Sequence, residues 1–198
     1  MISDPVRFNE AIACFDGANA EDPHTETFEG VELPKELLYA KRMTAWLERF
    51  APDASEELRL AARCQHIRRW NIPRNQYPMN RRGYIQWRMA LATFHAETAG
   101  EILRKVGYAQ ATIGRIQALL RKEKLKPAAE VQILEDVTCL VFLESYFAEF
   151  AEKHEEEKLI RIIRKTWAKM SPNGHKAALA LNLWPDLRAL VEKALAKR

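Results

Sequence analysis

Residues 83–107, GYIQWRMALATFHAETAGEILRKVG, decide how this chain folds. Apolar side chains recur in this stretch at helical intervals, at Tyr84, Trp87, Leu91, Phe94 and Ile102. This spacing places them on one face of a helix, and it predicts a long amphipathic helix from Gly83 to Val106. Gly107 follows at the position where a left-handed residue commonly ends a helix, and we expect the helix to stop there.

The rest of the chain has the same helical periodicity. Further helices are predicted over residues 6–20, 35–50, 53–70, 111–122, 128–152, 157–170, 171–183 and 186–196. The acidic residues 21–34 predict an exposed loop, and residues 71–80, which contain Pro73 and Pro78, predict a second loop. No window alternates at a period of two, so we expect an all-α fold, a multi-helix bundle in a single domain over residues 1–198.

The composition excludes several classes of protein. No apolar run approaches the ~18 residues that a membrane-spanning helix needs, and the first residues lack the basic and apolar regions of a signal peptide. Cys14, Cys64 and Cys139 are too few and too far apart for a disulfide framework or a zinc knuckle. Neither a glycine-rich nucleotide loop nor a GxSxG motif is present. We therefore expect a cytoplasmic protein with reduced thiols and no membrane partner.

The net charge of +4 conceals an uneven distribution. Residues 58–96 contain eight arginines and no Asp or Glu, and therefore carry +8. The other residues carry a net charge of −4, from 23 basic and 27 acidic side chains. Local charge bears on association more than on fold, so this segment indicates an anionic partner.

Arginines alternate with aromatic residues in and around the second predicted loop. Guanidinium groups bind phosphate oxygens in pairs and aromatic rings stack on bases, so the mixture favours a nucleotide-like ligand or exposed nucleic acid. The candidate substrate-binding residues are Arg68, Arg69, Arg74, Tyr77, Arg82, Trp87 and Arg88. The alternative is structural: the arginines lie on solvated helix faces or pair with the acidic residues 21–32, and the tryptophans belong to the core.

Two histidines and an acidic pair form a candidate metal site. His66 and His95 lie on consecutive predicted helices in the acid-free segment, whereas Glu135 and Asp136 interrupt an apolar helix. Because a buried charge requires a partner, imidazoles and a carboxylate from three helices could hold zinc, manganese or iron. Glu97 follows His95 closely and could orient a histidine or act as a base. The alternative is that both histidines are hydrogen-bonded core residues and that the acidic pair binds arginines.

Three segments resemble the HD-domain superfamily of metal-dependent phosphohydrolases. They are LAARCQHIRRWNIP (60–73), FHAETAGEILRKVG (94–107) and LEDVTCLVFLE (134–144). The resemblance implies an HD-like core over about residues 37–150, with helices 157–198 packed on it. It also implies a divalent metal held by His66, His95 and Asp136 or Glu135. The motif has departures, with other residues in place of its aspartates and first histidine: Ile67, Thr138 and Tyr39.

More narrowly, the whole chain resembles the uncharacterised family known as domain of unknown function 4202. Three hypotheses about function remain open. The first is an HD-like hydrolase of a phosphorylated or nucleotide-like small molecule, in which a metal activates water, arginines clamp the phosphate, and Glu97 and Asp136 are the catalytic candidates. The second is an RNA- or tRNA-binding module whose affinity falls steeply with salt. The third is an HD-like scaffold without chemistry. The acidic remainder of the chain would repel an extended polyanion and favours a compact anion site.

Overall fold

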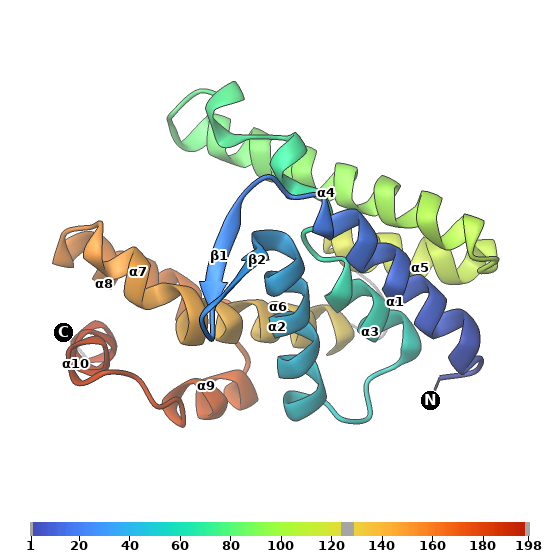
Figure 1. Ribbon diagram of the computed structural model, residues 1–198. Helices are drawn as coiled ribbons and strands as arrows, with labels where there is room; N and C mark the ends of the chain where they lie inside the picture. The colour runs from blue at the N-terminus through green and yellow to red at the C-terminus, as the bar shows by residue number, and fades with distance from the viewer. Residues whose placement is uncertain (1, 124–128, 197–198) are drawn as a thin grey trace. The chain divides into compact units, whose positions relative to one another are not determined.

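The long predicted helix is present as α4 (Arg81–Lys105), the green helix of Figure 1. Asn80 caps its start, because the Asn80 Oδ1 atom accepts a hydrogen bond of 2.9 Å from the amide of Gly83. Gly107 ends it in the left-handed conformation, with φ +89°, and the amide of Tyr108 reaches back to the carbonyl of Leu103. The predicted helix and its stop are both confirmed.

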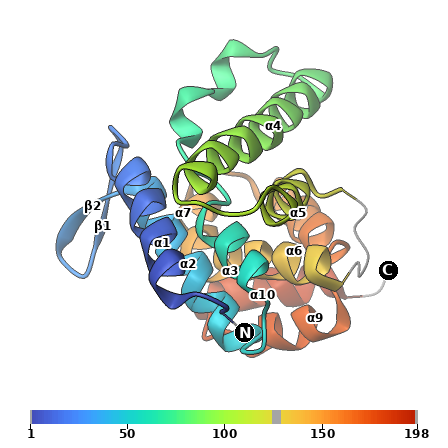
Figure 2. The same ribbon diagram turned by 90° about the vertical axis from the view of Figure 1, so that its right-hand side faces the viewer.

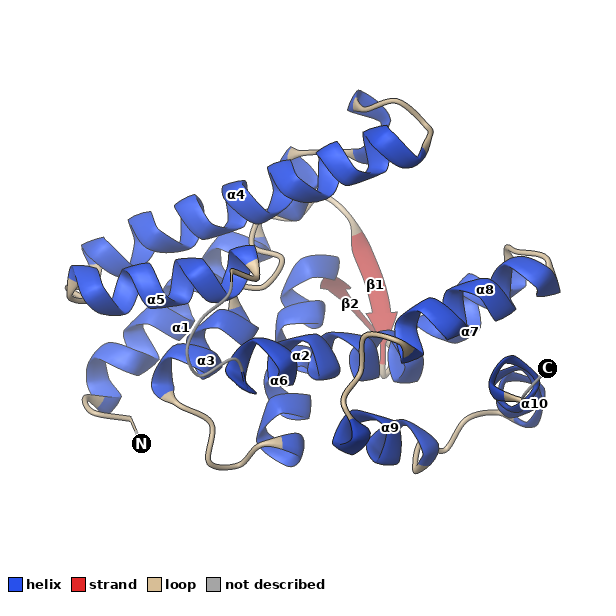
Figure 3. Cartoon of the chain, turned by 180° about the vertical axis from the view of Figure 1, so that it is seen from behind, coloured by secondary structure: helices blue, strands red, loops and turns tan. Residues whose placement is uncertain are grey.

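This computed structural model describes residues 2–123 and 129–196. Helices make up most of it, as Figure 3 shows, and the all-α prediction is confirmed. The chain forms two compact units, Met1–Val131 and Gln132–Arg198, and the division falls inside α6 (Ala129–Val141). We describe each unit by itself. None of the described helices is long and apolar enough to cross a membrane.

The first unit is built from helices that precede and follow α4. They are α1 (Pro5–Ala20), α2 (Lys35–Phe50), α3 (Glu56–Arg63) and α5 (Gln110–Arg121). Helix α5 lies along α4 in Figures 1 and 2, and also contacts α3. Fully buried apolar side chains from these helices form the core: Phe15, Met43, Leu47, Leu58, Leu103, Ile113, Ile116 and Leu119. The amphipathic pattern of each helix thus places its apolar stripe in this core.

A β-hairpin replaces part of the loop that the sequence predicts over residues 21–34. Strands β1 (Thr25–Phe28) and β2 (Val31–Pro34) pair antiparallel, with Thr25 opposite Pro34. Both turn residues have positive φ, 51° at Glu29 and 80° at Gly30, as a two-residue hairpin turn that matches the strand twist requires. Four-residue strands are too short to show a clear alternation, so the prediction of a loop was wrong here, although the region is mostly exposed as expected.

Between α3 and α4 the chain makes two short 3-10 turns, η1 (Arg69–Asn71) and η2 (Arg74–Gln76). Residues 71 and 74–76 of the predicted proline loop belong to these turns, and the rest of that loop up to α4 has no helical structure. Helix α3 ends at Arg63, earlier than expected, because a run of turns carries the chain from Cys64 to η1. These turns bring the backbone of Ile67 beneath α4, where its carbonyl oxygen meets His95.

The second unit begins within α6 and contains α7 (Phe147–Glu152), α8 (Glu156–Trp167), α9 (Pro172–Leu179) and α10 (Pro185–Leu195). A single π-helical turn, η3 (Phe142–Tyr146), joins α6 to α7. The helix predicted over residues 128–152 is therefore present with a π-turn inside it, and its first residue, Ala128, lies outside the described residues. Ser171 caps α9 and Pro172 opens it, as predicted.

Candidate functional site

A basic cavity of about 260 Å³ lies in the first unit between the turns after α3, helix α4 and the end of α5. Its charged lining residues are Arg69, Arg88, Arg121 and Lys122. Its other polar lining residues are Gln65, His66, Tyr84 and His95. The apolar lining residues include Ile85, Met89, Leu91 and Leu120. None of the described residues that line it is Asp or Glu. The cavity therefore combines an excess of positive charge with apolar lining residues.

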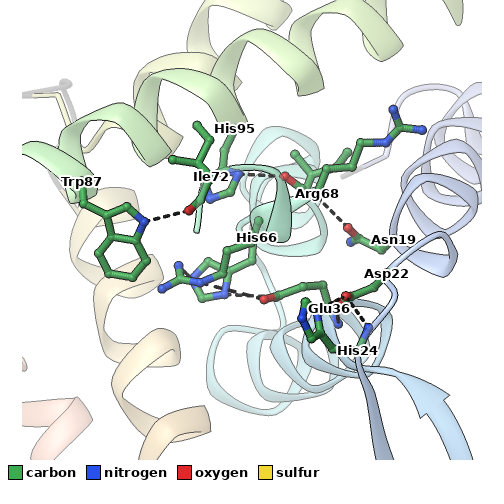
Figure 4. Close-up of polar contacts among 11 residues, drawn as sticks. Asn19, Asp22, His24, Glu36, His66, Arg68, Ile72, Trp87 and His95 are labelled. Atoms are coloured by element: carbon green, nitrogen blue, oxygen red, sulfur yellow. Dashed lines mark hydrogen bonds and ion pairs between the residues drawn. The ribbon is translucent and has the colours of Figure 1, made fainter. Parts of the chain in front are cut away.

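His66 is held between a carboxylate and a guanidinium group. Its Nε2 atom lies 3.2 Å from Nη1 of Arg69. Because arginine only donates, Nε2 must accept, and the proton of the neutral ring is on Nδ1. That nitrogen faces Oε2 of Glu36 at 3.4 Å, as Figure 4 shows. Tyr39 stacks on the ring at 4.0 Å. Burial and the adjacent positive charge of Arg69 hold the pKa of His66 well below its usual value, so the ring is neutral.

His95 has one nitrogen that no protein group satisfies. Its Nδ1 atom lies 2.8 Å from the carbonyl oxygen of Ile67, to which it donates. Burial lowers the pKa of His95 to about 3, so the neutral ring carries a lone pair on Nε2. Nε2 is buried and has no hydrogen-bond partner among the described residues. His95 is 4% exposed and lines the cavity, so this acceptor belongs to the site.

Glu36 is a buried carboxylate behind His66. It is 8% exposed, and burial raises its pKa to about 7, although the charge of Arg69 opposes the shift. Arg69 Nε lies 3.9 Å from Oε1 of Glu36. Glu36, His66 and Arg69 thus form a chain of polar contacts in which the proton content of the carboxyl group changes near neutral pH.

Lys122, which lines the cavity, and Arg68, which lies beside the lining residue Arg69 in the chain, adopt a left-handed backbone conformation that L-residues rarely use. Arg68 has φ 49° and Lys122 has φ 57°, which costs about 1 kcal/mol for each residue other than glycine. The Arg68 amide donates to Asn19 Oδ1 at 3.0 Å, and its guanidinium donates to Glu21 at 2.7 Å, so Arg68 has structural partners. Lys122 ends α5 with the same pattern of backbone hydrogen bonds that Gly107 gives α4. Lys122 lines the cavity, and its left-handed backbone conformation is less favourable for lysine than for glycine.

The predicted substrate-binding residues divide into two groups. Arg69 and Arg88 line the cavity. Arg74 instead donates to the carbonyl oxygens of Tyr77 and Pro78 at 3.0 and 2.8 Å, and Trp87 donates to that of Ile72 at 2.8 Å. Arg74 and Trp87 therefore hold the loop before α4 together. The remaining three do not line the cavity: Arg68 pairs with Glu21, Tyr77 is half-buried, and Arg82 is exposed.

Two of the predicted metal ligands lie together in the first unit, where the rings of His66 and His95 are 5.9 Å apart. The other two, Glu135 and Asp136, belong to the second unit, which is described by itself. There Glu135 pairs with Lys169, and Asp136 accepts hydrogen bonds from Ser171 and Gln132. Glu97 is exposed and is not among the residues that line the cavity.

The residues that line the basic cavity are by themselves a poor match for a divalent cation. Across residues 2–123 and 129–196, no three His, Cys, Asp or Glu side chains form a group that could hold a metal ion. A guanidinium group already donates to Nε2 of His66, and three further cationic side chains line the same cavity. A zinc, manganese or iron ion would meet like charges there, with two imidazole rings but no thiolate or carboxylate among the described lining residues to complete its ligand set.

Several residues in or next to the cavity were not predicted from the sequence. Glu36 could have been found from the sequence, because it lies at helical spacing from Tyr39 and Met43 and therefore falls on the buried face of α2. For Gln65, the only indication in the sequence is that it precedes His66. Arg121 and Lys122 lie outside the arginine-rich segment, and no local pattern indicates that the end of α5 reaches the cavity.

The comparisons with known proteins identify the family. The family model described as domain of unknown function (DUF4202) matches residues 9–191, and the chain belongs to this family. No curated protein and no solved structure matches the chain, so these comparisons give the HD-domain resemblance no support.

Proposed function

We propose that this member of the DUF4202 family binds a small molecule through a phosphate, or a similarly compact anionic group, in the basic cavity. The observation that carries the proposal is the lining of the cavity, with four cationic side chains and no acidic one among its described residues. Arg88 makes no ion pair or hydrogen bond with any residue that the structure describes. A guanidinium group in this position is available to donate two parallel hydrogen bonds to phosphate oxygens.

The dimensions of the cavity favour a small ligand over a nucleic-acid strand. A volume of about 260 Å³ lies just below the range of typical ligand pockets. Arg74 and Trp87, which the RNA hypothesis requires on the surface, are engaged with backbone carbonyl groups of the loop. RNA binding is therefore treated as the competing hypothesis, and the experiment below distinguishes it from phosphate binding.

The proposal concerns binding, and it does not include metal-dependent hydrolysis. Hydrolysis by a bound metal is the expectation from the HD resemblance, and it uses His66 as one of the metal ligands. Arg69 donates to Nε2 of His66 at 3.2 Å. The same arginine supports phosphate binding, because its donors can reach a phosphate oxygen in the cavity that it lines.

Titration calorimetry of the full chain with inorganic phosphate and with glycerol 1-phosphate tests the proposal. Replacing Arg88→Gln removes the charge but keeps most of the side-chain volume, and we expect the affinity for both compounds to fall about tenfold. Arg104→Gln, an exposed position on the same helix, is the matched control and should leave both affinities unchanged.

Two results would overturn this proposal. One is that the wild-type chain binds neither compound, or that Arg88→Gln has no larger effect than Arg104→Gln. The other is that a single-stranded RNA oligonucleotide binds more tightly than either compound and that Arg82→Gln weakens it as much as Arg88→Gln. The second result would place the site on the exposed surface of α4 and support the RNA hypothesis.

A further inference from the structure

Two residues that line the basic cavity each carry a buried hydrogen-bond acceptor without a partner among the described residues. These acceptors are Nε2 of His95 and Oε1 of Gln65. His95 is 4% exposed and Gln65 is 6% exposed, and both line the cavity. A buried acceptor without a donor is unfavourable, so such atoms indicate where a ligand supplies one.

From these two acceptors we infer that the ligand is a phosphate ester that carries hydroxyl groups, such as a polyol phosphate, a sugar phosphate or the ribose phosphate of a nucleotide. The inference rests on the proposed function and narrows it to a class of ligand. The cationic side chains bind the phosphate, and ligand hydroxyls donate to His95 and Gln65. The apolar lining residues Ile85, Met89 and Leu120 pack on the carbon skeleton.

His95 can act only as an acceptor toward the ligand. Its Nδ1–H is committed to the carbonyl oxygen of Ile67 at 2.8 Å. A second proton on the ring is disfavoured, because the ring is buried beside the positive charges of Arg69 and Arg88. His66 cannot take this role, since its Nε2 already accepts from Arg69. A ligand of this cavity must therefore donate a hydrogen bond to His95 and carry negative charge near the arginines.

A matched pair of compounds separates this inference from the proposed function. Glycerol 1-phosphate and propyl phosphate have the same three-carbon chain and the same phosphate, but only the first has hydroxyl groups. We expect the wild-type chain to bind glycerol 1-phosphate about tenfold more tightly, because two otherwise unsatisfied acceptors gain donors.

The variant His95→Asn removes the acceptor and keeps the hydrogen bond to Ile67. Its amide nitrogen takes the place of Nδ1 and can still donate, whereas nothing replaces Nε2. We expect the preference for glycerol 1-phosphate over propyl phosphate to fall to about twofold. His154→Asn is the control, because the Nδ1 atom of His154 also donates to a backbone carbonyl, that of Phe150, at 2.9 Å.

A ¹⁵N spectrum of the histidine rings provides a second readout on the unmodified chain. Glycerol 1-phosphate should shift the Nε2 signal of His95 as it accepts a hydrogen bond, and propyl phosphate should not. Equal affinities for the two compounds, an unshifted Nε2 signal, or a preference that survives in His95→Asn would overturn the inference and leave phosphate binding intact. Failure of both compounds to bind would overturn the proposed function together with the inference.

Discussion

The two units of the chain each contain a buried polar cluster, and the clusters differ in whether their atoms are satisfied. In the second unit, Asp136 is 1% exposed. Its Oδ1 accepts from the Ser171 amide at 2.8 Å and from Gln132 at 3.1 Å, and its Oδ2 accepts from the Ser171 hydroxyl at 2.6 Å. In the first unit, His95 and Gln65 are as deeply buried, yet each keeps an acceptor that no described residue satisfies.

This difference distinguishes the cluster around Asp136, which is structural, from the cluster at the proposed binding site. The Asp136 carboxylate holds the residue that caps α9, and a side chain at Gly174 would come within 2.6 Å of it, so the helix is built closely around the carboxylate. The cavity cluster has open acceptors, shifted pKa values at His95 and Glu36, and a residue in strained backbone conformation. Unsatisfied groups of this kind concentrate where ligands bind.

The largest effect is expected at Asp136. Asp136→Ala leaves three donors without their acceptor, and we expect the free energy of unfolding to fall by about 4 kcal/mol in urea denaturation. Glu192→Ala, an exposed change in the same unit, should cost less than about 0.5 kcal/mol. Phosphate affinity of the folded protein should not change. A stable Asp136→Ala variant that has lost phosphate binding would instead make Asp136 a site residue and support the metal-ligand prediction.

The next effect is a pH dependence at Glu36. Its folded pKa of about 7 lies above the usual value of 4.5, so the fold favours the protonated carboxyl group. That stabilisation is fully present below pH 4.5 and is lost as the pH rises through about 7. Relative to the wild type, Glu36→Gln should therefore gain up to about 3 kcal/mol of stability between pH 4.5 and pH 8.

Urea denaturation of both proteins at several pH values measures this gain. Glu48→Gln, at an exposed position of α2, serves as the control and should track the wild type at every pH. A difference in the free energy of unfolding between Glu36→Gln and the wild type that stays constant with pH would contradict this prediction. It would mean that the fold does not shift the pKa of Glu36 and would remove one of the differences between the cavity cluster and the cluster around Asp136.

The smallest effect is expected for Lys122→Gly. This substitution should raise the stability of the protein and lower its affinity for phosphate. Glycine adopts the left-handed conformation of this position without strain, so Lys122→Gly should raise the free energy of unfolding by about 0.5 kcal/mol. The same change removes a cation from the cavity and should lower phosphate affinity about fivefold. Lys122→Arg keeps the charge and should change neither quantity much. Unchanged affinity in Lys122→Gly would show that the lysine has no part in the site.

The helices and half of the site could be predicted from the sequence, because both depend on local patterns. Periodicity alone located α4, and the position of Gly107 located its end. The absence of acids over residues 58–96 drew attention to Arg69 and Arg88, and both line the cavity. The short strands at residues 25–34 were not predicted, because four residues are too few to show the alternation of apolar and polar side chains that marks a strand.

The rest of the site depends on contacts between distant parts of the chain. Arg121 and Lys122 reach the cavity only because α5 packs along α4. The sequence correctly marked Asp136 as an unusual charge in an apolar helix, but its partner Ser171 lies 35 residues further along. Arg74 has the same composition signal as Arg88, and only the fold distinguishes an arginine that holds a loop from one that faces a cavity.

The most direct test of the central claim is a map of backbone amide shifts in the ¹H–¹⁵N spectrum during titration with glycerol 1-phosphate. The account predicts shifts that concentrate at Gln65, Arg69, Arg88 and Lys122, with none around Asp136 and Ser171. Shifts that cluster around Asp136, that follow the exposed arginines at the start of α4, or that are absent altogether would contradict it.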